Sequence, residues 1–162
     1  MDDRALALKR LTVAAERFVE TIEGLPDDLF RRRMDGWSPR DVVAHLIGWN
    51  LSTVVGCEEI LRGNPPAYLG DVDEEFRHVN DESVRRYSAE DRGGLLADLH
   101  ATMDEAAAYV QSLTPSSWSA SVRFRCFTIS VADCFDGLRQ DVDVDRRQIL
   151  DWSARRQNGK EI

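Results

Sequence analysis

The sequence predicts an all-α protein, a four-helix bundle with long crossover connections and one short extra helix. Apolar residues recur at steps of three and four along four long stretches, and Ser or Asp capping signals precede several of them. The connections around residues 63–73 and 114–129 are too long for simple hairpins, which favours crossovers over a strict up-down path. With 162 residues and no long linker, the chain is expected to be one domain over residues 1–162.

The first helix is expected over residues 3 to about 24. Gly24 and Pro26 end it, because glycine is favoured just past a helix and proline cannot continue one. Its apolar face is formed by Leu6, Leu8, Leu11, Ala15, Phe18, Val19 and Ile22. Residues 25–37 are expected to form a loop.

The second helix has the clearest start signal in the chain. Ser38 is the expected N-cap, Pro39 takes the first helical position, and Asp41 closes a capping box. The helix is expected to run to about Arg62, where Gly and Pro residues follow. His45 lies among its apolar positions.

Residues 67–87 are expected to begin as a loop and to become helical near Asp73. A second capping box over residues 88–91 is expected to open a long helix that continues through Leu113, where Thr114 and a proline end it.

The last third combines an extended stretch with the longest helical pattern. Residues 118–129 lack a helical period, which predicts an extended crossing segment. Ser130 and Asp133 form a third capping-box candidate before a helix over residues 131–152. The polar tail that follows is expected to fray.

Two aspartates interrupt the apolar stripe of this last helix. Asp145 takes a position that should be apolar, and Asp141 flanks the same face one turn earlier. Burying two like charges is costly unless an Arg, a shared proton or a metal ion lies between them. Both carboxylates could ligate one ion, and His45 from a facing helix could complete an open three-ligand site. The commoner structural interpretations are a satisfied core histidine and a solvated face of Asp–Arg ion pairs.

Composition narrows the function classes. The net charge of -8 argues against a nucleic-acid or anionic-membrane partner, and no apolar run approaches the length of a membrane span. Three cysteines without CxxC spacing predict reduced thiols in a cytoplasmic protein. Among them, Cys134 is expected to be a packing residue whose thiol is poorly activated, because nearby carboxylates raise the pKa of a thiol.

Three segments carry a resemblance to a known family. GWSPRDVVAHLIGW (residues 36–49) resembles the second-helix signature of the DinB/YfiT-like superfamily, in which a tryptophan precedes a capped helix that carries the first metal histidine, here His45. DVDVDRRQI (residues 141–149) is similar to the family segment His-x-x-x-His-Arg-Gly-Gln-Ile, with Asp141 and Asp145 at the histidine positions. Residues 73–100 resemble a third segment, in which an Asn precedes a leucine-rich helix.

The resemblance implies a four-helix bundle with a metal-binding triad, commonly a homodimer, that acts on a small-molecule substrate. The family that the chain resembles includes enzymes that use mycothiol or bacillithiol, mycothiol-dependent maleylpyruvate isomerase, and colibactin self-resistance proteins that hydrolyse a cyclopropane warhead. It therefore implies that His45, Asp141 and Asp145 hold a divalent metal (Mn, Fe, Ni or Zn) and that a low-molecular-weight thiol takes part. The two aspartates in place of histidines favour the harder ions Mn, Fe or Mg over Zn.

Two classes of function stay open from the sequence, beside a third interpretation in which the chain is a purely structural dimeric bundle. In the first, a metal-dependent enzyme transfers a thiol to a small electrophile or hydrolyses that electrophile, because a bound metal lowers the pKa of a thiol or water. In the second, the bundle binds a small molecule without metal, as a self-resistance protein or a protein without catalytic activity. His45 would then be an imidazolium between the two carboxylates.

Overall fold

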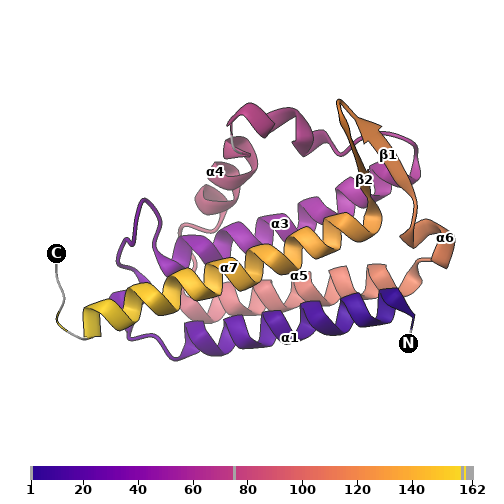
Figure 1. Cartoon of the computed structure of the whole chain (residues 1–162). Helices are drawn as coiled ribbons and strands as arrows, with labels where there is room; N and C mark the ends of the chain where they lie inside the picture. Colours follow the sequence, from indigo (N-terminus) through magenta and orange to yellow (C-terminus); the bar gives the residue numbers. More distant parts are fainter. Residues whose placement is uncertain (1, 75, 158, 160–162) are drawn as a thin grey trace.

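The computed structural model describes residues 2–74, 76–157 and 159, and within them four long helices lie side by side (Figure 1). These are α1 (Asp3–Glu23), α3 (Pro39–Leu61), α5 (Arg92–Ser112) and α7 (Val131–Gln157). Helix α7 packs against α1 and α3, and α3 packs against α5. The predicted all-α bundle is confirmed. No helix in the described part of the chain is both long and apolar enough to cross a membrane.

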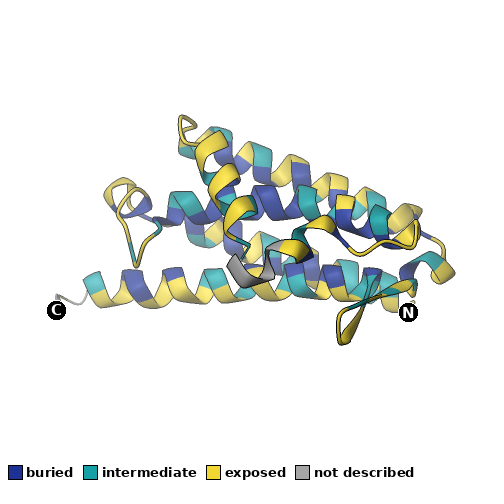
Figure 2. Ribbon diagram, turned by 90° about the horizontal axis from the view of Figure 1, so that it is seen from above, coloured by how far each residue is buried: buried dark blue, intermediate teal, exposed yellow. Residues whose placement is uncertain are grey.

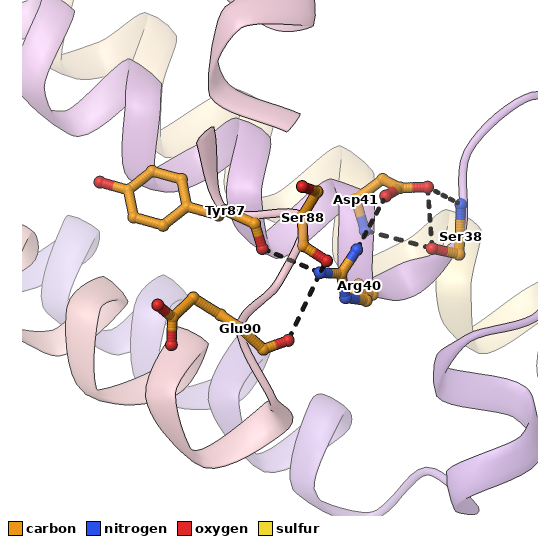
Figure 3. A network of polar contacts seen from close by, with 6 residues as sticks. All are labelled: Ser38, Arg40, Asp41, Tyr87, Ser88 and Glu90. Atoms are coloured by element: carbon orange, nitrogen blue, oxygen red, sulfur yellow. Dashed lines mark hydrogen bonds and ion pairs between the residues drawn. The ribbon is translucent and has the colours of Figure 1, made fainter. Parts of the chain in front are cut away.

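Helix α3 begins as the sequence predicts. Asp41 N donates to Ser38 Oγ at 3.2 Å, and Ser38 N donates to Asp41 Oδ2 at 2.9 Å, which completes the capping box. Arg40, in the first turn, donates to the backbone carbonyls of Tyr87 and Ser88 (Figure 3). The start of α3 is therefore bound to the end of α4 (Arg77–Arg86).

A separate layer made of the 3₁₀ helix η1 (Ala67–Glu74) and α4 covers one side of α3 (Figure 1). Glycines let this layer approach closely. A Cβ on Gly48 would lie 1.8 Å from Ser83 Oγ, and one on Gly56 would lie 2.7 Å from the Tyr68 ring. Two missing side chains on α3 thus set the height of the covering layer.

The core divides into two clusters of buried side chains. Buried positions alternate with exposed ones along the long helices (Figure 2). One cluster is apolar throughout and contains Phe18, Ile22, Val43, Ile47, Leu95 and Ile149. The other lies beside the covering layer and contains Trp49, Cys57, Trp118, Val131, Cys134 and Phe135.

Several local expectations were wrong in the first two thirds of the chain. The loop after α1 contains the short helix α2 (Asp27–Phe30). The segment expected to turn helical near Asp73 is already 3₁₀-helical from Ala67. The N-cap of α5 is Asp91, whose carboxylate accepts from Gly94 N at 2.8 Å, and not Ser88. Ser88 instead presents its carbonyl to Arg40, so the chain turns there before the helix begins.

The expected crossing segment is a hairpin. Strands β1 (Ser121–Phe124) and β2 (Phe127–Ser130) pair in antiparallel register, and Arg125 takes a positive φ of 52° in the turn. The capping box before α7 is confirmed, since Asp133 N donates to Ser130 Oγ at 3.1 Å and Ser130 N donates to Asp133 Oδ2 at 2.8 Å. The expected fraying after residue 152 is wrong up to Gln157, and residues 158 and 160–162 lie outside the described residues.

Candidate functional site

A cavity of about 360 Å³ lies between α3, α7 and the covering layer. Its size suits a small organic molecule. The three candidate residues from the sequence all line it, together with Trp49, Thr53, Tyr68, Leu69, Phe76, Asn80, Ile129, Asp133, Cys134, Gly137 and Leu138. The structure thus brings His45, Asp141 and Asp145 to one cavity.

His45 and Asp145 face one another across it. The Nε2 atom of His45 lies 3.7 Å from Oδ2 of Asp145, and the two side chains are 12% and 18% exposed. Helix α3 supplies the histidine and α7 the aspartate. Both groups are therefore largely removed from water. Interactions between polar groups are stronger in such a buried environment than in water.

Asn80 on α4 determines which nitrogen of His45 carries the proton. Trp49 Nε1 is only a donor, and it lies 2.8 Å from the Asn80 side-chain atom that His45 Nδ1 meets at 2.9 Å. That atom must therefore be the amide oxygen, and an oxygen can only accept. Neutral His45 consequently carries its proton on Nδ1 and turns the lone pair of Nε2 toward Asp145.

Two lone-pair atoms thus point at one another. Oδ2 of Asp145 is buried, and no residue in the described part of the chain gives it a hydrogen bond. Two acceptors are a poor arrangement unless a proton or a cation lies between them. At 3.7 Å the atoms are too far apart for a direct hydrogen bond and near enough to share a small cation.

Burial shifts the titration of both groups in opposite directions. Desolvation lowers the pKa of His45 to about 4, although the hydrogen bond to Asn80 raises it. Desolvation raises the pKa of Asp145 to about 7, and the charge of Asp141 adds to that rise. Without a cation, His45 is neutral near pH 7 and the carboxyl group of Asp145 is about half protonated. An imidazolium bridging two carboxylates, the metal-free arrangement considered from the sequence, therefore does not suit this burial.

Asp141 occupies a different place from its two predicted partners. It lies at the rim of the cavity and is exposed, although desolvation still raises the pKa of its carboxyl group. Among the described residues, no three His, Cys, Asp or Glu side chains stand close enough to hold an ion together. The structure thus pairs His45 with Asp145 and leaves Asp141 beside the pair.

Sequence reasoning missed the aromatic wall of the cavity. Trp49 makes edge contacts with Tyr68 and Phe76, each with ring centroids 5.2 Å apart. Trp49 is buried in the core, and it also lines the cavity and donates to Asn80. Its four-residue spacing from His45 on one helix was the signal that could have revealed this second role.

Comparison with known proteins relates the chain to one family and one fold. The family model of the DinB superfamily matches residues 10–136, a range that includes His45 and ends before Asp141. The crystal structure of a protein from Streptococcus pneumoniae has a similar fold, with a TM-score of 0.72 and 16% sequence identity over 93% of this chain and 90% of that chain. None of the curated proteins matches the chain.

Proposed function

The chain belongs to the DinB superfamily, and from this premise we propose that it is a metal-dependent enzyme acting on a small electrophilic molecule in the cavity between α3 and α7. The observation that carries the proposal is the facing pair of lone-pair atoms, His45 Nε2 and Asp145 Oδ2, 3.7 Å apart. A divalent cation between them would satisfy both atoms.

The residues present fit such an ion through a neutral imidazole nitrogen and a carboxylate oxygen. Both are ordinary ligands of Mn, Fe, Ni and Zn. Asn80 supports the fit, because a ligating histidine typically donates its other ring N–H to an oxygen that fixes its orientation. Asp141 stands one helical turn from Asp145 and would be a carboxylate beside the site. A bound divalent ion would lower the pKa of a thiol or water molecule at this point.

The protein side chains would perform the remaining tasks. The wall of Trp49, Tyr68 and Phe76 would hold an apolar part of the substrate and exclude water. Asp141, exposed at the rim, would accept the proton released when a thiol or water is deprotonated. The reaction classes that this arrangement supports are transfer of a low-molecular-weight thiol to the electrophile and hydrolysis of the electrophile.

Metal stoichiometry tests this proposal. We expect purified protein incubated with Mn, Fe, Ni or Zn and then dialysed to retain about one ion per chain, and the His45→Ala and Asp145→Asn variants to lose it. Asp143→Asn is the matched control: Asp143 lies between the two candidates on α7 but pairs with Arg139 at 2.9 Å. Absence of retained metal in the unaltered protein, or equal loss in the control, would overturn the proposal.

A second candidate is binding of a small molecule without metal. It is favoured by the aromatic wall and by the pKa of Asp145, which burial raises to about 7, so that a proton can occupy the place of a cation between Asp145 and neutral His45. Under this alternative, apolar ligands would raise the melting temperature of the protein and divalent metals would not. The same thermal measurements with each metal therefore separate the two candidates.

A further inference from the structure

A second group of reactive side chains lies at a different place in the same cavity. Cys134 lines the cavity on α7, 11 residues before Asp145 in the sequence and hence about 16 Å away along the helix axis. Cys57 on α3 is fully buried in the same core cluster. The hydroxyl of Tyr68 lies 3.6 Å from Cys134 Sγ.

We propose that Cys134 and Cys57 form an oxidation site for hydroperoxides, in which Cys134 attacks the peroxide and Cys57 resolves the product into a disulfide. The proposal does not depend on a metal at His45. Cys134 lines the cavity, where a small molecule can reach it, whereas Cys57 is fully buried and does not belong to the residues that line the cavity. Access thus divides the two roles between the cysteines.

Their electrostatic surroundings support the same division. Interactions with the Cys57 thiol and the Tyr68 hydroxyl lower the pKa of Cys134, although burial and Asp133 act in the opposite direction. The same interaction, together with burial, raises the pKa of Cys57. The sequence-based expectation for Cys134 considered only the nearby carboxylates and did not include the Tyr68 hydroxyl, which lies 3.6 Å from its sulfur. A thiol with a lowered pKa attacks, and its protonated neighbour resolves.

The chemistry is balanced by the peroxide alone. Cys134 sulfur attacks one peroxide oxygen, the O–O bond breaks, and the leaving alkoxide or hydroxide takes the thiol proton, which yields a sulfenic acid and an alcohol or water. Cys57 sulfur then attacks the sulfur of that sulfenic acid. The S–O bond breaks, the departing hydroxide takes the Cys57 proton as water, and a disulfide remains. The two sulfurs lose two electrons together and the peroxide gains them.

Thiol counting in the full-length protein tests the proposal. The Cys126→Ser background removes the exposed cysteine of the hairpin and leaves the proposed pair unchanged. After treatment with hydrogen peroxide or tert-butyl hydroperoxide, denaturation and alkylation, we expect both remaining thiols to be blocked, a monomer mass lower by about 2 Da, and a peptide that links Cys57 to Cys134. Two alkylated thiols after treatment, or a disulfide between chains, would overturn it.

Second variants in that background distinguish attack from resolution. With Cys57→Ser added, Cys134 should stop at the sulfenic acid and react with dimedone, whereas with Cys134→Ser added, Cys57 should stay reduced. Tyr68→Phe should slow the loss of thiols several-fold without changing the product, because it removes one donor to Cys134. Oxidation of Cys57 in the absence of Cys134, at the rate of the paired protein, would show that the assigned roles are wrong.

Discussion

Helix α3 places a polar residue into each of two neighbouring interfaces, and the two are resolved differently. On the side facing α5, Asn50 Nδ2 donates to Thr102 Oγ1 at 3.0 Å, and that hydroxyl donates to a carbonyl of its own helix at 2.9 Å. On the side facing α7, His45 meets Asp145 at 3.7 Å, acceptor against acceptor. In the first pair a donor meets an acceptor, although Asn50 Oδ1 has no hydrogen-bond partner among the described residues, whereas in the second pair two acceptors face one another.

Burial alone therefore does not mark the functional residue, since Asn50 is more deeply buried than His45. Two features separate the pairs: the direction of the lone pairs, and a cavity at one pair. The α5 side should accordingly respond to substitution through stability, and the α7 side through binding.

The largest expected effect lies on the α5 side. Ile47→Ala removes a fully buried side chain from the apolar cluster, and we expect it to lower the free energy of unfolding by about 2–5 kcal/mol through lost burial and a cavity. Urea denaturation measures this cost. The amount of metal retained per folded chain should be unchanged. A loss of metal in proportion to the loss of stability would contradict the distinction between the α5-facing and α7-facing interfaces of α3.

The next largest effect concerns the support of His45. Asn80→Ala removes the acceptor that fixes its Nδ1–H tautomer, and we expect metal affinity to fall about 10- to 100-fold. Calorimetric titration with the retained metal measures it. Ser83→Ala is the matched control on the same helix, because the Ser83 hydroxyl donates to the Val79 carbonyl one turn earlier and, among the described residues, to no other group. Equal affinities in the two variants would contradict the role given to Asn80.

Asp145→Leu should separate stability from binding in one step. It replaces a buried carboxyl group whose Oδ2 receives no hydrogen bond from the described residues. We expect the variant to bind no metal and, compared with the unaltered protein in metal-free form, to gain about 1–2 kcal/mol in unfolding free energy. Chelator-treated samples compared by urea denaturation provide the measurement. A destabilised variant would mean that Asp145 has a structural partner.

The smallest effect is expected in the pH dependence of the unaltered, metal-free protein. The raised pKa of Asp145 contributes stability below about pH 4 that is lost as pH rises to about 7. The lowered pKa of His45 contributes stability above about pH 6.5 that is lost as pH falls to about 4. The two contributions oppose one another in this window, so their sum should be nearly flat.

Variants should expose each contribution. Asp145→Asn leaves His45 alone, and unfolding free energy should fall by up to about 1.4 kcal/mol per pH unit as pH decreases from 6.5 to 4, relative to the unaltered protein. His45→Gln should show the opposite slope. Urea midpoints across this range measure both, and parallel profiles for all three proteins would refute the opposed shifts.

The sequence predicted the fold, and it placed His45 and Asp145 on the inner faces of their helices, because both depend on local patterns. The stripe of α7 marked Asp145 as an intrusion, and the Ser38 capping box set the start of α3 and with it the face on which His45 lies. The pairing with Asn80 could not be derived, since it depends on how a 3₁₀ segment and α4 fold back over α3. The exposure of Asp141 depends on the rotation of α7 by a fraction of a turn, which a helical period does not define.

The height of the covering layer has a consequence for specificity. Ser83 and Tyr68 pack directly against Gly48 and Gly56, so the covering layer lies as close to α3 as backbone contact permits. Neither glycine lines the cavity. A methyl group added at either position would nevertheless push the covering layer away from α3 and from His45. Relatives could thus admit bulkier molecules through substitutions at positions that do not contact the substrate. The same two positions could be used to change the cavity volume by design.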